Sequence, residues 1–151
     1  MTTLRHCSTA LAALLFALPA VAQVTVTDAY VRSTVKGQMA TAAFMKLKSA
    51  KDARLVEAKS PVAGVVEIHE MVMQDNVMRM RAVDAVDLPA GRTVELKPGG
   101  YHVMLMDIKQ RVKTGDVVPV TLVIDTGGKR ETMEVRAPVR AATARSDATK
   151  E

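Results

Sequence analysis

The sequence predicts an all-β fold, a single β-sandwich domain, and three observations support this. The apolar residues after position 22 fall in short runs rich in Val, Ile, Thr and Met. Gly, Pro, Asp and Asn recur between these runs. Outside the first 22 residues, we find no convincing amphipathic helical pattern. Many short strands with regular turn signals are typical of a sandwich.

The strands are expected in order along the chain, each bounded by residues that favour turns. We expect strands at 24–27, 39–48, 54–58, 65–73, 77–83, 93–96, 101–107, 117–126 and 129–136. The turn signals between them are Lys36-Gly37, Pro61, 89–91, 98–100, 114–116 and 127–128. Together, these strands and turns predict one domain over residues 23–139. The segment 140–151 has no apolar periodicity and is expected to be a disordered tail.

One hairpin is predicted with its register. Asp75-Asn76 tolerate positive φ and make a plausible two-residue turn, which places Met73 opposite Met78 and Met71 opposite Met80. Residues two apart on a strand share a face. His69 and the four methionines therefore share one face, whereas Glu70 and Arg81 pair on the other.

Residues 1–22 predict a cleaved signal peptide. Arg5 supplies the positive start, an apolar run spans 11–18, and Ala-Val-Ala at 20–22 is a small-residue cleavage signal. Cys7 precedes the apolar run, which is the wrong place for a lipid-modified cysteine at the cleavage site. We expect a soluble protein of the periplasm, cleaved near Ala22, with no stable membrane insertion.

Charge and composition limit the classes of partner that the protein could bind. The formal net charge is +5, but aromatic residues make up only 3% of the chain. Export and the lack of aromatic stacking residues argue against nucleic acid. Cys7 is the only cysteine and leaves with the leader, so the remaining chain has no thiolate for a metal and no disulfide.

The candidate functional residues are histidines set among methionines. His69 and His102 are the only histidines after residue 22, and methionines follow each at alternating positions. Neutral imidazole and soft thioether favour Cu(I) over hard cations. A methionine stripe is more often core packing, but its coincidence with both histidines favours a copper site.

The spacing of these residues resembles a known family. Ten residues separate His69 from Met80, 21 separate Met80 from His102, and one separates His102 from Met104. This is the His-x10-Met-x21-His-x-Met signature of the PCu(A)C periplasmic copper chaperones. The sequences of residues 77–81 and 99–106 also resemble the corresponding segments of that family.

The resemblance implies a cupredoxin-like β-sandwich. It also implies that His69, Met80, His102 and Met104 hold Cu(I) near the surface. The copper would go to cytochrome c oxidase assembly, either to an oxidase subunit directly or with a Sco-type thiol protein. Two departures stand out: Glu70 follows the first histidine where many relatives have methionine, and neither His nor Met occurs after Met133. The second departure puts an additional Cu(II) site in doubt.

Several alternatives remain open. Met71 is either a spare ligand or hairpin packing, and we favour packing; whether Met106 assists is also open. A blue-copper electron carrier needs a cysteine thiolate, and no catalytic arrangement of nucleophile and base is evident, so we expect no enzyme. A copper storage or tolerance protein would share every ligand. A purely structural β-domain would use the same residues only for packing.

Overall fold

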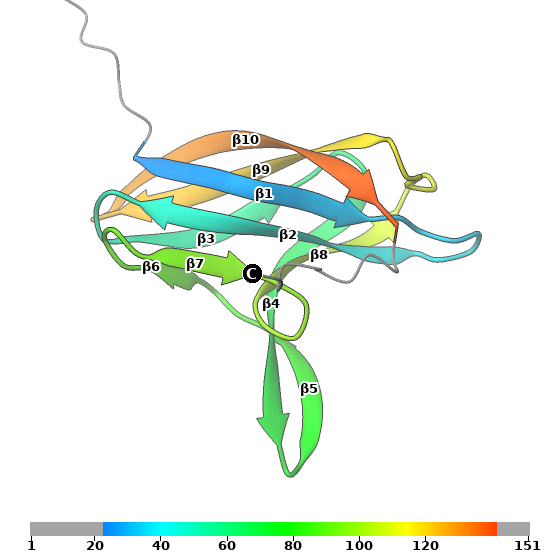
Figure 1. The fold of residues 1–151 in the computed structure, drawn as a ribbon, viewed down its shortest axis with the longest axis horizontal. Helices are drawn as coiled ribbons and strands as arrows, with labels where there is room; N and C mark the ends of the chain where they lie inside the picture. Colours follow the sequence, from blue (N-terminus) through cyan, green and yellow to red (C-terminus); the bar gives the residue numbers. More distant parts are fainter. Residues whose placement is uncertain (1–22, 142–151) are drawn as a thin grey trace, which may run out of the picture.

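The computed structural model describes residues 23–141, and within that range it contains ten β-strands and no helix (Figure 1). The strands are β1 Val24–Arg32, β2 Ala40–Ser49, β3 Ala53–Lys59, β4 Ala63–Gln74, β5 Val77–Ala82, β6 Val86–Leu88, β7 Thr93–Leu96, β8 His102–Ile108, β9 Val117–Thr126 and β10 Lys129–Arg140. The predicted all-β fold is confirmed.

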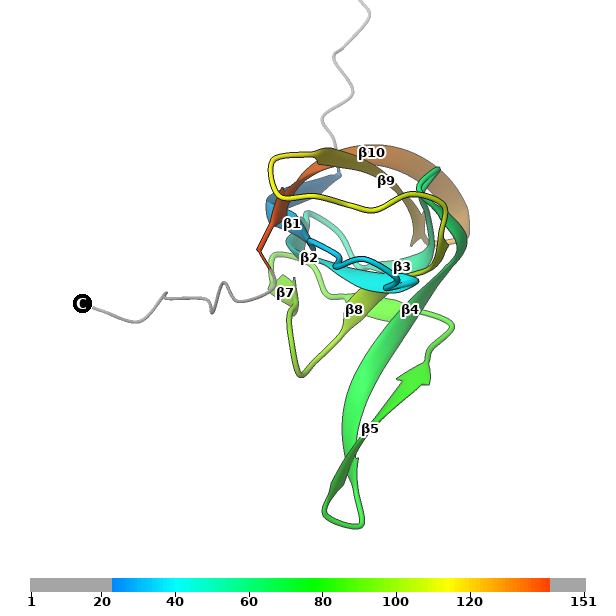
Figure 2. The ribbon, with the colours of Figure 1, turned by 90° about the vertical axis from the view of Figure 1, so that its right-hand side faces the viewer.

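The strands form two layers joined through one parallel pair. The continuous order is β5-β4-β8-β2-β1-β10-β9-β3-β6, and β7 pairs with β2 outside this path. β1 and β10 pair in parallel, and the other strand pairs are antiparallel. The layer with β9 and β10 therefore faces the layer with β2 and β8, as seen end-on in Figure 2.

The core lies between these layers. Both contribute fully buried aliphatic side chains at alternating strand positions, as expected where one face of each sheet is covered. The largest of them are Met45, Leu47, Leu55, Leu88, Leu96, Leu105 and Leu122. This packed interior fixes β8 and β4, the strands that carry both candidate histidines.

The β4–β5 hairpin has the predicted register. Met73 lies opposite Met78 and Met71 opposite Met80, and Glu70 lies opposite Arg81. Asp75 and Asn76 have φ values of 50° and 60°. Positive φ at both turn residues matches the right-handed twist of the two strands. The hairpin projects beyond the body of the sandwich (Figures 1 and 2).

Most strand bounds agree with the prediction to within two residues, but three differences are larger. β1 continues past residue 27 because Asp28, with φ of 53°, sits at a β-bulge that shifts the register instead of ending the strand. β6 is only three residues long and has too little pattern to be found in the sequence. Arg140, predicted as the first tail residue, is the last residue of β10 and pairs with Arg32.

The predicted signal peptide, 1–22, and residues 142–151 of the predicted tail lie outside the described residues. Within 23–141, there is no helix long and apolar enough to cross a membrane.

Candidate metal centre

The three strands β5, β4 and β8 bring the candidate ligands together at one end of the strand order. His69 on β4 lies directly opposite His102 on β8. On the other side of β4, Met71 lies opposite Met80 of β5. Met104 is two residues beyond His102 on β8 and therefore shares its face. Residues from two segments separated by 21 positions thus meet on one sheet face.

The ring of His102 is held in one tautomer. Its Nδ1 lies 3.0 Å from the carbonyl oxygen of Gly100. Because a carbonyl only accepts, Nδ1 carries the hydrogen, and in the neutral ring Nε2 is left with a free lone pair. Nε2 lies 3.1 Å from Sδ of Met80.

This contact brings two electron-pair donors together. In the neutral ring neither Nε2 nor the thioether carries a hydrogen to share. A soft cation held by both donors would replace this unfavourable contact with two ligand bonds. Imidazole nitrogen and thioether sulfur suit a soft metal, so the residues present fit the Cu(I) cargo expected from the sequence.

His69 packs against His102 and has its own partner. The two ring centroids are 5.9 Å apart. Nε2 of His69 lies 2.7 Å from Oε2 of Glu67, whereas Nδ1 is buried and has no hydrogen-bond partner within residues 23–141. A carboxylate on one ring nitrogen orients a ligand histidine and leaves the other nitrogen available for metal.

A pocket of about 340 Å³ opens beside these residues. Met80, His102 and Met104 line it together with Met71, but His69 does not. Phe44 forms part of the wall, with its ring centroid 6.2 Å from that of His102. The pocket therefore gathers three of the four candidate ligands, and the fourth contacts one of them.

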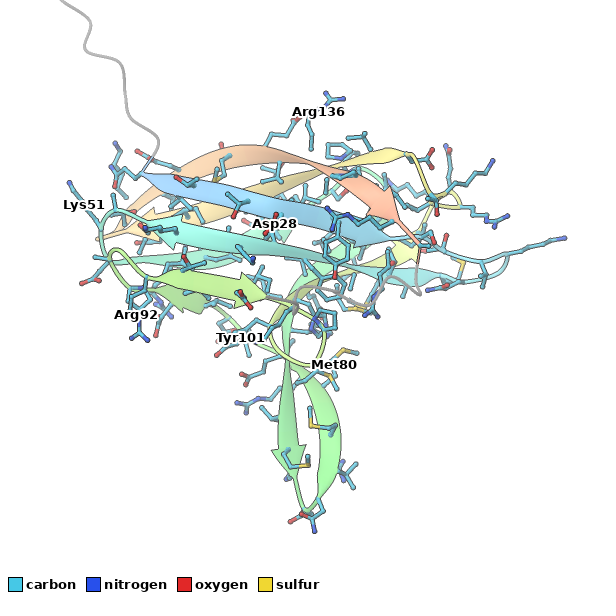
Figure 3. All side chains as sticks on the ribbon, viewed as in Figure 1. Asp28, Lys51, Met80, Arg92, Tyr101 and Arg136 are labelled. Atoms are coloured by element: carbon cyan, nitrogen blue, oxygen red, sulfur yellow. The ribbon has the colours of Figure 1, made fainter. Side chains whose placement is uncertain are left out.

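The ligands differ in their access to solvent. His69 and His102 are buried, Met104 is half-buried, and Met80 is 49% exposed. Figure 3 shows Met80 where the hairpin joins the sandwich. Met80 is thus the candidate ligand most open to solvent, whereas the side chains of both histidines are largely covered.

Sequence comparison identifies the family. Residues 24–139 match the family described as "Putative lipoprotein LpqE-like". The chain belongs to the LpqE-like family. The "Putative lipoprotein Lxx21020" of Leifsonia xyli is 33% identical over 118 residues, which cover 78% of this chain and 69% of that protein.

Solved structures extend the likeness of this LpqE-like protein to copper-binding domains. The copper-bound PCuAC domain of PmoF2 has a TM-score of 0.65 at 26% identity, with 81% of this chain and 96% of that chain covered. The apo-DR1885 structure from Deinococcus radiodurans has a TM-score of 0.61 at 31% identity, with coverage of 95% and 97%. The Cu(I) form of DR1885 matches with a TM-score of 0.55 at 31% identity over 83% and 81%. The resemblance to PCu(A)C proteins and the cupredoxin-like fold are confirmed.

Sequence reasoning missed three groups around the site of this LpqE-like protein. They are the Glu67 carboxylate, the Gly100 carbonyl and the Phe44 ring. Glu67 shares a strand face with His69 two residues later, and this spacing was a usable signal. Gly100 also stands two residues before its histidine, but a backbone carbonyl has no sequence signature. Phe44 comes from a distant strand, and its contact depends on the β2–β8 pairing.

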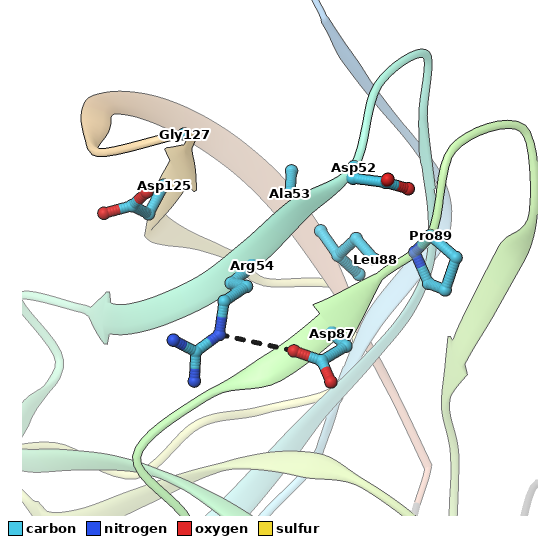
Figure 4. A pocket seen from close by; sticks show the side chains of 8 residues that line it. All are labelled: Asp52, Ala53, Arg54, Asp87, Leu88, Pro89, Asp125 and Gly127. Atoms are coloured by element: carbon cyan, nitrogen blue, oxygen red, sulfur yellow. Dashed lines mark ion pairs between the residues drawn. The ribbon is translucent and has the colours of Figure 1, made fainter.

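A second pocket of about 460 Å³ lies at the other end of the strand order, along β3 and β6 (Figure 4). It has three aspartates, but each already has a partner. Asp87 pairs with Arg54 at 3.3 Å, Asp52 accepts from the Ala90 amide, and Asp125 accepts from the Gly128 amide. This pocket contains none of the candidate copper ligands.

The LpqE-like protein should keep His102 neutral to a lower pH than an exposed histidine. Burial is the main cause lowering the pKa of His102 from its ordinary 6.5; the bond to Gly100 opposes this, and nearby His69 and Arg32 lower it further. A proton-detected pH titration of the metal-free protein by NMR should give a His102 midpoint below that of an exposed histidine.

The lowered pKa of His102 also makes the free energy of unfolding depend on pH. Since the unfolded chain binds this proton more tightly, the contribution of His102 is complete above about pH 6.5. It is lost as the pH falls from there through the lower folded pKa. A His102 midpoint at or above that of the unfolded chain contradicts the expected direction.

Proposed function

We propose that this protein is a periplasmic metallochaperone that carries Cu(I) to cytochrome c oxidase assembly. His69, Met80, His102 and Met104 are the proposed ligands. The observation that carries the proposal is the 3.1 Å approach of His102 Nε2 to Met80 Sδ in a pocket that Met104 also lines. Copper in the similar PmoF2 domain and Cu(I) in DR1885 support the choice of cargo.

The donor set favours the reduced ion. Thioether sulfur is soft and neutral, and imidazole is neutral when deprotonated, so together they suit Cu(I) better than hard divalent cations. Cys7 is the only cysteine of the chain and precedes the domain. A blue-copper centre needs a cysteine thiolate, so we propose a carrier and neither an electron-transfer protein nor an enzyme.

The difference in exposure suggests an order of release. Met80 is 49% exposed and comes from an edge strand, whereas His102 is 5% exposed and is held by Gly100. An incoming thiolate of an acceptor meets Met80 first and displaces this weak neutral ligand. The two histidines and Met104 then hold the ion until the acceptor supplies a second donor, so free copper is not released.

Export fits this chemistry. In an oxidising compartment, cysteine pairs form disulfides, whereas thioethers keep their metal-binding sulfur until they are converted to sulfoxide. The lipoprotein description of the family supports export. We propose that residues 1–22 act as a cleaved leader, because Arg5 precedes an apolar run at 11–18 and Ala-Val-Ala follows at 20–22.

A transfer experiment tests the function. The copper-loaded protein is mixed with the metal-free copper-binding domain of a cytochrome c oxidase subunit, with or without a reduced Sco-type protein, and copper is measured on each after separation. We expect copper to move to a thiol-bearing acceptor much faster than it dissociates into a dilute chelator. Copper that reaches the acceptor only at the spontaneous dissociation rate supports the storage or tolerance alternative instead.

A further inference from the structure

Two methionines near the tip of the β4–β5 hairpin are not used by the proposed centre. Met73 and Met78 lie directly opposite each other in the antiparallel ladder. Directly opposite residues have Cβ atoms about 4.5–5.5 Å apart and point to the same face. That separation lets two thioether side chains converge on one ion.

These side chains do not serve the core. Met73 is 65% exposed and Met78 is 44% exposed, and every residue of β5 is exposed. Methionine usually fills space in a protein core. Core packing does not explain two methionines that lie opposite each other and are both exposed to solvent. Figure 3 shows sulfur atoms following the hairpin away from the sandwich.

The hairpin holds the pair in a defined geometry. The turn residues Asp75 and Asn76 both adopt the positive φ of a tight hairpin turn. On the opposite face, Arg81 Nε donates to Oε1 of Glu70 at 2.6 Å, which ties the two strands together. The thioether face is therefore separate from the charged face.

The pair is also in line with the proposed centre. Met71 and Met80, the next pair on the same face, both line the pocket that contains His102. Successive pairs on one face are two residues apart, roughly 7 Å along the strand. An ion at the tip is thus one pair away from Met80, the most exposed of the proposed ligands.

We propose that Met73 and Met78 form a second, weaker site for Cu(I), through which the ion is loaded onto or released from the principal centre. Two thioethers without an imidazole bind the ion less tightly than the four-ligand centre. Solvent, or a donor atom of the acceptor protein, completes the coordination. The ion remains Cu(I) throughout, and only neutral ligands exchange. The inference rests on the proposed function, because it presumes a Cu(I) cargo.

The test follows each methionine methyl group by NMR. The full protein, with ¹³C-labelled methionine methyl groups, is titrated without oxygen with Cu(I), and separately with Ag(I) as a redox-inert substitute. We expect the methyl groups of Met80 and Met104 to shift with the first equivalent. Those of Met73 and Met78 should shift only with later additions, at an affinity at least tenfold weaker.

Matched variants locate the second site. Met73→Leu combined with Met78→Leu keeps the apolar volume but removes both sulfurs, and it should abolish the weak binding phase and leave the first equivalent unchanged. Met39→Leu is the control, because Met39 is an exposed methionine, at 56%, outside the hairpin. This control should retain both phases.

The outcomes separate the two proposals. If the Met73 and Met78 methyl groups do not respond to excess metal, or if the double variant keeps the weak phase, the second site is refuted and an apolar contact surface for a protein becomes the better account of this pair. If they shift together with the first equivalent, they belong to the principal centre and the two-site proposal is also wrong. If Met80 and Met104 fail to respond, the proposed function itself fails.

Discussion

Replacing His102 with asparagine should lower Cu(I) affinity by more than roughly 100-fold. Losing a residue that only contacts a metal ligand already costs up to about 100-fold, and His102 is proposed to bind the metal directly. Asparagine can still donate a hydrogen bond to the Gly100 carbonyl, which Nδ1 of His102 reaches at 3.0 Å. It has no atom in place of Nε2, the nitrogen that approaches Met80. Competition with a Cu(I)-specific chelator measures the loss, and NMR of the metal-free variant checks that the fold is retained.

Two variants in the hairpin test how much individual methionines contribute to Cu(I) binding. Met80→Leu should come close to His102→Asn in its effect, because the sulfur of Met80 is the one in contact with Nε2. Met71→Leu should weaken binding less, although Met71 lines the same pocket. If Met71→Leu proves as damaging as Met80→Leu, the assignment of Met71 to packing is wrong.

Local chemistry explains why the hairpin was predictable. Asp75-Asn76 fixes the turn, and a two-residue turn fixes every pair along the ladder. The same reasoning fails at Asp28, because a bulge interrupts β1 without ending it. A turn-forming residue in a sequence does not distinguish a bulge from a strand end, because Asp28 in the bulge and Asp75 in the turn both adopt positive φ here.

The pairing of β4 with β8 is a different kind of prediction. The spacing of the histidines and methionines indicated that the two strands share a metal, but not that His69 lies opposite His102. That register is set by the core faces of the strands, where Ile68 and Val103 are buried. The ring partners Glu67 and Gly100 do not depend on this register, because each lies two residues before its own histidine. The spacing of Glu67 was a usable signal, whereas the carbonyl of Gly100 leaves no mark in the sequence.

Adjacent residues of β8 should separate stability from copper binding. Met104 shares a face with His102 and lines the pocket, whereas Leu105 points to the opposite face and is completely buried in the core. Met104→Leu conserves volume and should change the free energy of unfolding by less than about 1.5 kcal/mol. It should nevertheless reduce Cu(I) affinity sharply, because leucine has no donor atom.

Leu105→Ala should do the reverse. It leaves a cavity among the core side chains and should lower the free energy of unfolding by about 2–5 kcal/mol, while Cu(I) affinity measured well below the melting temperature stays within a few-fold of the original. Denaturant unfolding must be done on metal-free protein, because a bound ion stabilises the folded state by mass action. A large loss of affinity in Leu105→Ala would mean that core packing of β8 also sets the ligand geometry. Unchanged affinity in Met104→Leu would remove Met104 from the proposed ligand set and leave His69, Met80 and His102 to hold the ion.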